Sequence, residues 1–388
     1  MNAGLIREGK ARIKTSSDGE TVFYNPAARF SRSVGVVAVA AEGHIKNMKL
    51  AIADAFSATG VRGIRYFLES QAVDSLYLND ASPQAAAVSE ENAQLNEILE
   101  YTRISQMKAN NFLSTHAAGG RRFDFVDVDP FGSPVAFLDD ALSAVRRHGV
   151  VAFTATDLAP LCGLHRRAAL RRYGSLPLRG EFCHETASRI IIHSIARSCG
   201  RRDLLPEVLL TVFSEQYLRV YVRVSPGKAA FPHKDIGFIY SCPRCHYTSY
   251  FVFEKGDFIR GCPTCGSKVS IAGPLWVGPL HSGVFVEEME RSLEVLAEEA
   301  DKRRLAKYIG LFKEESQYPP YFFDVAEAAD RMDVRTPKIS GVLEMLRAKG
   351  FKASRTHFKA SGVKTDASYQ DFQDAVQEAL SLSRGVSP

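Results

Sequence analysis

The chain has 388 residues, of which 45% are hydrophobic and 24% are charged, and its formal net charge is +5. Two or three domains are expected at this length. The composition is that of a soluble globular protein, and no apolar run approaches the roughly 20 residues of a membrane-spanning helix, which excludes a membrane protein. The N-terminus lacks an apolar signal core, so we expect a cytoplasmic protein. The mild positive charge permits a nucleic-acid partner without requiring one.

Strand-like and helix-like segments alternate from residue 36 to residue 225. This alternation predicts an α/β domain with a parallel sheet covered by helices on both faces. Two β-like runs, 208–213 and 218–224, follow each other closely and should form an antiparallel hairpin. A Rossmann-like sheet that ends in such a hairpin is typical of S-adenosylmethionine-dependent methyltransferases. The expected strands are 50–56, 75–78, 103–107, 123–128 and 149–154, and the expected helices include 83–99, 134–147 and 186–198.

A loop of small residues follows the first expected strand, and it contains Asp54, Ser57 and Gly60. An acid, small residues and then a helix start form a cofactor-binding loop, because a ligand can approach the backbone closely there. The loop lacks GxGxxG spacing, which disfavours a dinucleotide oxidoreductase. Asp80, about 20 residues further on, is placed to bind ribose hydroxyls. The alternatives are a tight strand-to-helix turn and a cap for the helix that begins at Pro83.

Residues 121–132 run from an apolar strand into Asp129, Pro130 and Phe131. In a parallel sheet this trio lies at the carboxyl end of its strand, where such folds bind ligands. The Asp129 carboxylate and the carbonyl before Pro130 can each accept a hydrogen from a planar amine, and Phe131 can stack on its ring. The alternative is an ordinary Asp-Pro turn.

A basic segment lies at residues 164–173, with four arginines, one histidine and no acid. Such a segment predicts contact with phosphates, and the alternative is a solvated charged face. The candidate RNA-binding residues are Arg166, Arg167, Arg171 and Arg172.

The segment 225–228, Ser-Pro-Gly-Lys, interrupts the alternation and predicts a domain boundary. Beyond it, two CxxC pairs are separated by sixteen residues, the pattern of a structural zinc ribbon with four thiolate ligands. The predicted ligands are Cys242, Cys245, Cys262 and Cys265. The other cysteines, Cys162, Cys183 and Cys199, are expected to be buried packing residues.

Two short helices, 325–331 and 336–349, precede a basic, aromatic-containing segment at 351–359, and this order resembles a winged helix. We therefore expect a methyltransferase domain over 1–225, with an N-terminal extension over 1–48, and a C-terminal α+β domain over 226–388. The zinc ribbon would span about 240–270 and the winged-helix-like segment about 318–370.

Taken together, the motifs resemble the tRNA guanine-26 N2-dimethyltransferase family (Trm1) of archaea and eukaryotes, in its archaeal form. The resemblance spans nearly the whole chain. The matching segments are 23–26, Arg32, 58–65, 78–80, 127–134, 154–157, 160–163, 177–181, 183–185, 354–358 and 364–367.

The resemblance implies that Arg32, Arg65 and Asp80 contact S-adenosylmethionine, with Asp80 on the ribose. The family usually has an Asp-Ala pair at the adenine, where this chain has Lys108-Ala109. A lysine cannot accept the adenine amino hydrogen. Either the Ala109 backbone makes this contact or the correspondence shifts locally. Arg355 and Lys364, in the last two motifs, are expected to contact RNA.

The implied activity is methyl transfer from S-adenosylmethionine to N2 of guanine 26 in tRNA, first to N2-methylguanosine and then to N2,N2-dimethylguanosine. Asp129 and its carbonyl would hold the amino group, and Phe131 would stack on a base flipped out of the tRNA. The expected cofactors are S-adenosylmethionine and a structural Zn²⁺, and the expected partner is tRNA, without an obligate protein partner. The alternatives are the same chemistry on another tRNA or rRNA guanosine and a non-enzymatic nucleic-acid binder.

Overall fold

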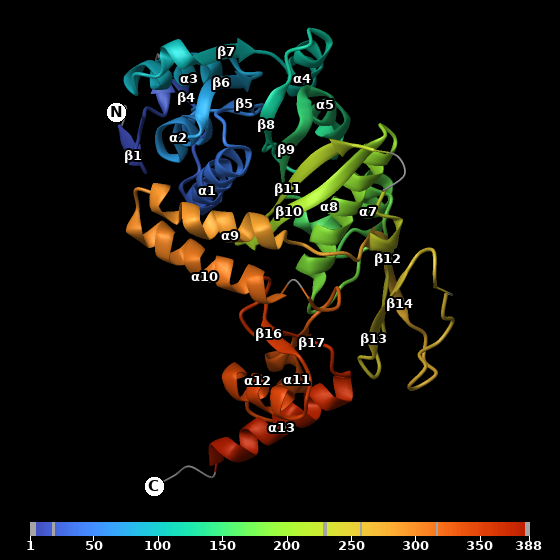
Figure 1. Ribbon diagram of the computed structural model, residues 1–388. Coiled ribbons are helices and arrows are strands. Elements are labelled where there is room, and N and C mark those ends of the chain that lie inside the picture. Colours follow the sequence, from blue (N-terminus) through green and yellow to red (C-terminus); the bar gives the residue numbers. More distant parts are fainter. Residues whose placement is uncertain (1–4, 18–19, 228–230, 257, 316, 385–388) are drawn as a thin grey trace.

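A seven-stranded sheet forms the centre of the N-terminal half of the molecule (Figure 1). The computed structural model describes residues 5–17, 20–227, 231–256, 258–315 and 317–384. The strand order is β10-β11-β9-β8-β5-β6-β7. The strands are β5 (Leu50–Asp54), β6 (Val73–Asp80), β7 (Thr102–Gln106), β8 (Phe123–Val128), β9 (Val145–Ala155), β10 (Leu204–Ser214) and β11 (Tyr217–Pro226).

The strand directions confirm the predicted fold class. The five strands from β9 to β7 are parallel. Strand β11 runs antiparallel between β9 and β10, and β10 and β11 form the expected hairpin. In a parallel sheet the carboxyl ends of neighbouring strands meet at one edge, so the loops after β5, β6 and β8 are brought together.

One predicted helix is shorter than expected. The residues at 134–147 form a 3-10 turn (Val135–Phe137) and the helix α5 (Leu138–Ala144), and strand β9 begins already at Val145. The basic residues Arg146 and Arg147, at the end of the predicted helix, lie exposed at the start of β9 instead. Arg146 pairs there with Asp124, at 2.6 Å. The ion pair and the hydrogen bonds of the sheet therefore favour a strand where we predicted a helix.

Helices cover both faces of the sheet. One face packs against α4 (Ala109–Ala118), α5 and α8 (Cys183–Gly200). The other face packs against α1 (Arg29–Lys46) and α2 (Val61–Ser70). Helix α3 (Pro83–Leu95) begins at Ser82, whose hydroxyl accepts a hydrogen bond from the Ala85 amide at 3.3 Å, and Pro83 suits the first helical position.

Two helices from the second half of the chain complete the core beneath α1. They are α9 (Gly283–Arg291) and α10 (Glu299–Glu315). Both lie alongside α1 in Figure 1, and Phe285, Met289 and Phe312 are buried in the same core as residues of α1. The C-terminal half of the sequence thus contributes two helices to the hydrophobic core that contains α1.

The remaining C-terminal residues form two small units. The first is a three-stranded antiparallel sheet of β12 (Ile236–Ser241), β13 (Thr248–Val252) and β14 (Ser270–Trp276) that carries the cysteine pairs. The second joins a sheet of β15 (Phe323–Asp324), β16 and β17 to α11 (Val325–Arg331), α12 (Ile339–Ala348) and α13 (Tyr369–Arg384). Its helix–helix–hairpin order agrees with the predicted winged-helix-like segment, with the hairpin formed by β16 (Ala353–Arg355) and β17 (Gly362–Thr365). Among the described residues, no helix has the length and apolarity needed to cross a bilayer.

Buried polar residues join the winged-helix unit to the rest of the molecule. Glu315, at the end of α10, bonds to His281 at 3.0 Å and to the Thr356 hydroxyl at 2.6 Å. Glu181 accepts a hydrogen bond from the Asp324 amide at 3.0 Å. These hydrogen bonds hold the unit against the rest of the molecule. The polar groups that form them are buried and would be unsatisfied without their partners.

The junction makes stability depend on pH. Burial raises the pKa of Glu181 from 4.5 to about 7, although Arg331 and the Asp324 amide favour its charged form. The unfolded chain therefore ionises first as pH rises, and the folded state loses stability between pH 4.5 and 7, by about 3 kcal/mol in total. We expect the difference in unfolding free energy between wild type and Glu181→Gln to change across this interval and to be constant above it. A difference that is independent of pH contradicts this assignment.

Candidate functional site

A cavity of about 870 Å³ opens at the carboxyl edge of the sheet. This volume is near the upper end of the usual range for ligand pockets, about 300–1,000 Å³. The loops after β5, β6, β8 and β9 contribute to its wall, together with residues before α1 and the β10–β11 turn. Of the predicted site residues, the cavity is lined by Arg32, Ser57, Asp80, Asp129, Pro130 and Phe131.

The loop after β5 forms one wall of the cavity. Gly60 has a φ of +76°, a left-handed conformation that glycine adopts without strain, and α2 begins at the next residue. Asp80, at the end of β6, ties this loop in place because its Oδ2 accepts from the Ala58 amide at 3.0 Å and its Oδ1 from the Ser82 amide at 2.9 Å. Asp80 is therefore not the cap of α3, a position that Ser82 occupies.

The predicted catalytic trio lies at the mouth of the same cavity. Asp129 directly follows β8, and its carboxylate hydrogen bonds to the guanidinium of Arg62 on α2. Phe131 is 81% exposed, so its ring is free to stack on a ligand. The ring of Phe23 meets Phe131 edge to face, with centroids 4.9 Å apart. The arrangement offers an acceptor and an exposed aromatic face to one planar group.

The charge of Asp129 is set by its neighbours. Burial raises the pKa of Asp129, but the positive charges of Arg62 and Arg219 and a hydrogen bond with Thr154 outweigh it, so the pKa lies below its ordinary value. Beneath it, Arg219 is fully buried, pairs with Asp127 and bonds to Thr154 at 2.6 Å. Asp129 is thus an ionised acceptor at neutral pH, held by a buried network.

A second set of contacts fixes the loop after Phe131. The Gly132 amide donates to Thr156 Oγ1 at 2.8 Å, and the Thr156 amide donates back to the Gly132 carbonyl at 3.0 Å. The Tyr173 hydroxyl lies 2.7 Å from Asp157 Oδ1 and 2.8 Å from Ser133 Oγ. Tyr173 is the last residue of α7 (Arg166–Tyr173), so the predicted RNA-binding helix is joined to the loop of the catalytic trio.

Buried polar atoms without a hydrogen-bond partner occur in residues of the cavity wall. Within the described part of the chain these include Ser31 Oγ, Thr59 Oγ1 and Arg62 Nη1. A buried polar group without a partner is costly, and a polar ligand is one way to satisfy it. The wall therefore suits a ligand with carboxylate, amino and hydroxyl groups, such as S-adenosylmethionine.

The prediction for Arg65 is wrong. Arg65 is fully buried one turn further along α2, where it bonds to Glu8 at 2.8 Å, to Glu69 at 2.6 Å and to Ser33 at 3.0 Å, and it does not line the cavity. Arg62 is the arginine of this motif that reaches the cavity. Arg32 lines the cavity as predicted, and Glu8 bonds to its Nε at 2.7 Å. Glu8 lies on the N-terminal strand β1 (Ile6–Glu8), a segment in which we predicted no site residue.

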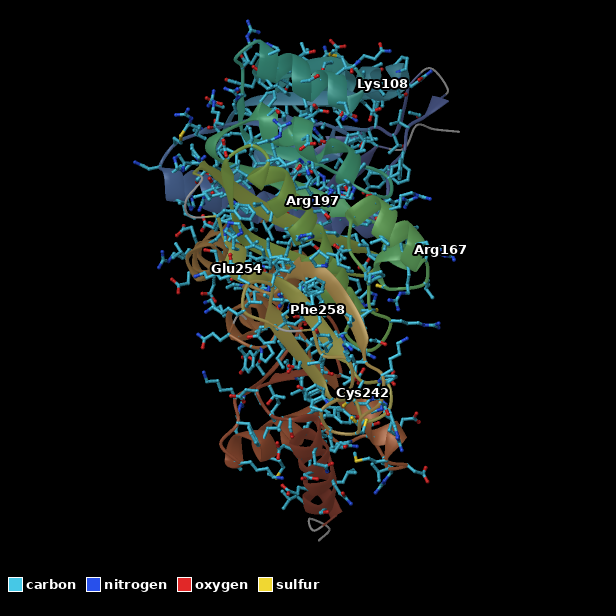
Figure 2. The ribbon with its side chains drawn as sticks, turned by 90° about the vertical axis from the view of Figure 1, so that its right-hand side faces the viewer. Lys108, Arg167, Arg197, Cys242, Glu254 and Phe258 are labelled. Carbon is cyan, nitrogen blue, oxygen red and sulfur yellow. The ribbon has the colours of Figure 1, made fainter. Side chains whose placement is uncertain are left out.

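Besides Arg65, four further predicted cofactor residues lie outside the cavity lining. Asp54 is buried at the end of β5, and its burial beside Asp127 raises its pKa to about 7. Gly60 shapes the loop without lining the cavity, and Lys108 and Ala109 stand at the start of α4. In Figure 2, Lys108 lies near one end of the molecule and Cys242 lies in the opposite half. A contact of Lys108 or Ala109 with adenine therefore stays a prediction.

The four predicted zinc ligands come together. The sulfurs of Cys242 and Cys265 are 3.6 Å apart, those of Cys245 and Cys262 are 3.4 Å apart, and all four lie within 4.8 Å of one another. A tetrahedral site with Zn–S bonds of about 2.3 Å has sulfur–sulfur edges of about 3.8 Å. The cluster fits a structural zinc, because four thiolates leave the ion no open position for catalysis.

The remaining cysteines differ in their surroundings. Cys199 is buried, as expected, whereas Cys162 and Cys183 are only partly buried. Their sulfurs lie within 4.8 Å of each other and of the ring of His184. Cys162 packs against the main core as expected, but the prediction that Cys162 and Cys183 are buried is wrong, because both are only partly buried.

The predicted RNA-binding residues divide into two groups. All four arginines of α7 are exposed, and so is Arg355. Arg172 pairs with Asp157 at 3.1 Å, and the described residues provide no ion pair for Arg166, Arg167 or Arg171. Lys364, by contrast, is 1% exposed and pairs with Glu185. The prediction that Lys364 contacts RNA is wrong, because its ammonium group is buried beneath the winged-helix unit.

Because Lys364 is buried against Glu185, its removal should affect the stability of the protein. In Lys364→Met the buried Glu185 keeps Arg189 as a partner, at 2.8 Å, but loses one of its two cations. We expect the unfolding free energy to fall by about 3 kcal/mol, as for other broken buried ion pairs, while tRNA affinity measured well below the melting temperature stays unchanged. The matched control is Arg355→Ala, an exposed change that should lower tRNA affinity without altering stability. Weaker tRNA binding by a Lys364→Met protein of wild-type stability contradicts the structural role.

Comparison with known proteins places the chain in a family. The family model described as N2,N2-dimethylguanosine tRNA methyltransferase matches residues 4–377. The chain is 36% identical to the tRNA (guanine(26)-N(2))-dimethyltransferases of Methanothermobacter thermautotrophicus and Pyrococcus abyssi, over 96% of this chain and 98% of each relative. It is also similar to the solved structure of Trm1 from Pyrococcus horikoshii with S-adenosyl-L-methionine, at 34% identity and a TM-score of 0.83, over 96% of this chain and 99% of that one. The chain therefore belongs to the N2,N2-dimethylguanosine tRNA methyltransferase family.

Proposed function

We propose that this protein transfers methyl groups from S-adenosylmethionine to the exocyclic N2 of guanine 26 in tRNA, giving N2-methylguanosine and then N2,N2-dimethylguanosine. The observation that carries the proposal is one cavity whose wall includes both Asp80 and the Asp129-Pro130-Phe131 trio. The first suits a nucleoside ribose and the second suits a planar amine. Family membership and the printed activity of the relatives support the same reaction.

S-adenosylmethionine would be held by residues of the cavity wall, and when bound it supplies an electrophilic methyl group. Asp80 would accept hydrogen bonds from the ribose hydroxyls, since each of its oxygens has a lone pair beyond its amide contact. Ser57, Thr59, Arg62 and Arg32 offer polar groups to the amino-acid end of the cofactor. Asp54 and Gly60 would act indirectly, by shaping the loop between β5 and α2.

Asp129 would orient the guanine amine. The N2 lone pair of guanine is conjugated with the ring, so the nitrogen is a weak nucleophile and alignment contributes most of the rate. The ionised carboxylate and the Asp129 carbonyl would each accept one amino hydrogen and turn the nitrogen toward the methyl group. Because its pKa is low, Asp129 is a weak base before transfer. It would take the proton from the strongly acidic alkylated amine afterwards.

Phe131 would stack on the target base, with Phe23 beside it. A guanine within the folded tRNA cannot reach the cavity, so it must flip out at a cost of a few kcal/mol. The 81% and 55% exposed rings of Phe131 and Phe23 offer the stacking surface that compensates for this cost. The monomethylated amine still has one hydrogen for Asp129, which permits a second transfer.

The RNA body would bind outside the cavity. The exposed arginines of α7 and Arg355 supply positive charge for phosphates. We keep a methyltransferase domain over 1–225 and a C-terminal RNA-binding domain over 226–388 as the proposed division. The zinc site would hold the β12–β14 module together, and the protein would act in the cytoplasm on tRNA.

The test is methyl transfer from labelled S-adenosylmethionine to an unmodified tRNA transcript, followed by nucleoside analysis. We expect label in N2,N2-dimethylguanosine at position 26 and no label in a G26→A transcript. Label in another tRNA or rRNA guanosine would move the target and keep the chemistry. An enzyme that binds the cofactor and labels no RNA contradicts the proposal and favours a nucleic-acid binder.

A further inference from the structure

The zinc module carries a group of aromatic rings that extends beyond its own core. Strands β12 and β13 pair Phe238 with Phe251, and these two rings stack with centroids 5.3 Å apart. Phe253 lies 6.1 Å from Phe238, and Phe258 lies 5.1 Å from Phe238 and 5.3 Å from Phe251. We call these four residues the aromatic face. Phe238 and Phe251 lie on one side of the small sheet, and the rings of Phe253 and Phe258 contact them from outside the strands.

The outer rings of the aromatic face are not needed to bury the zinc site. The small core around the cysteines contains Tyr240, Cys242, Cys262 and Val269, with Phe251 packed against it. Phe253 and Phe258 lie outside that core and are 59% and 56% exposed. Two phenylalanines that remain in water contribute little to the fold and mark a surface for interaction.

Gly256, in the loop after Phe253, lies directly against the ring of Phe251. A Cβ added at Gly256 would lie 1.9 Å from the Phe251 ring, so only glycine permits the loop to pass over this ring. The ring of Phe258 stands edge-on against both Phe238 and Phe251. The aromatic face is therefore assembled by the fold around Phe251.

Two exposed cations stand beside the aromatic face, in a segment (253–260) whose sequence also contains Glu254 and Asp257. Lys255 and Arg260, on the same loop, are exposed, and no ion pair holds either of them in the described part of the chain. The nearby Glu254 has a histidine neighbour, His233, at 4.0 Å. Figure 2 shows Phe258 and Arg167 of α7 on one side of the molecule. Exposed rings next to free cations suit a ligand with flat bases and phosphates.

We propose that the aromatic face binds unpaired nucleotides of the tRNA substrate, with bases stacked on Phe253 and Phe258 and phosphates beside Lys255 and Arg260. The inference rests on the proposed function and deepens it, because it assigns an RNA contact to the zinc module. Aromatic rings on a sheet recognise single-stranded RNA in this way, whereas they cannot reach bases inside a helix. Cations near the rings favour RNA over a second copy of the chain, whose net charge is also positive.

The test compares Phe253→Ala/Phe258→Ala with wild type and with Tyr101→Ala. Tyr101 is a 45% exposed aromatic at the β7 edge of the large sheet and serves as the matched control. We expect the double variant to bind labelled tRNA about tenfold more weakly, which corresponds to about 1.4 kcal/mol. Its zinc content, melting temperature and kcat at saturating tRNA should remain those of wild type. A Kd within twofold of wild type overturns the inference.

Salt dependence separates stacking from charge. The slope of log Kd against log salt should be unchanged in the double variant, because stacking releases no counterions. In Lys255→Ala/Arg260→Ala the slope should fall by about 0.7 for each lost phosphate contact. Light scattering that shows a wild-type dimer, broken by the phenylalanine changes at unaltered tRNA affinity, overturns the inference in favour of self-association.

Failure of the inference can be distinguished from failure of the proposed function. If the wild type transfers no methyl group to tRNA, the proposed function fails, whereas binding of a fluorescent single-stranded uridine oligonucleotide still reports on the aromatic face. If methylation at position 26 is intact and the double variant binds both RNAs as wild type does, only the aromatic-face inference fails.

Discussion

Asp129→Ala should reduce methyl transfer by about a hundredfold to a thousandfold while S-adenosylmethionine binding changes by no more than a few-fold. The substitution removes the acceptor that orients the amine, and lost positioning groups of this kind cost about 10²–10³ in rate. It also leaves the guanidinium of Arg62 without the carboxylate it pairs with. Single-turnover transfer at saturating cofactor, together with calorimetric cofactor binding, measures both quantities.

Asp129→Asn is the matched control, because asparagine has nearly the shape of aspartate but carries no charge. The amide keeps an oxygen acceptor but has no charge to take the proton, so turnover should fall between wild type and the alanine variant. Because the pKa of Asp129 lies below its ordinary value, the carboxylate is already ionised at mildly acidic pH. A wild-type rate that rises tenfold between pH 6 and 8 would therefore belong to another group. An alanine variant with turnover within tenfold of wild type removes Asp129 from its assigned role.

Cys245→Ser should remove zinc from the protein and unfold the β12–β14 module. Structural zinc contributes about 10–16 kcal/mol of binding free energy to small modules, far more than the core around the cysteines can replace. We expect elemental analysis to show the loss of about one zinc per chain and proteolysis to cut within residues 240–270. A chelator should act on wild type in the same way.

The control for this experiment is Cys199→Ala, which changes a buried cysteine far from the cluster in sequence. It should lower stability modestly and leave the zinc content at the wild-type value. Undiminished metal content and stability in Cys245→Ser would defeat the assignment of a zinc ligand.

Local patterns in the sequence predicted much of the fold and part of the site. Alternating segments predicted the sheet, and the close spacing of β10 and β11 predicted their hairpin. The order of strand, acid, proline and aromatic placed Asp129 at the carboxyl edge, since that position follows from the direction of one strand. The cluster of four cysteines could also be predicted from the sequence, because the two CxxC spacings identify its members.

Residues whose environment depends on distant partners could not be predicted. Arg62 and Arg65 are one helical turn apart, and the partners that hold Arg65 in the core include Glu8 and Ser33, which are distant in sequence, whereas Arg62 faces the cavity. Lys364 looked like an RNA contact until the fold brought it to Glu185, 179 residues earlier. One signal was available for Arg219, since a cation within a largely apolar strand needs an anion when it is buried.

The position of α9 and α10 beside α1 has a consequence for how the protein is made. Synthesis proceeds from the N-terminus, so the whole seven-stranded sheet leaves the ribosome before these two helices do. Until Glu315 has emerged, the apolar side of α1 that they cover faces water or a chaperone. The catalytic half of a nascent chain therefore cannot reach its final form by itself, and a truncation at residue 225 should aggregate instead of giving a small active enzyme.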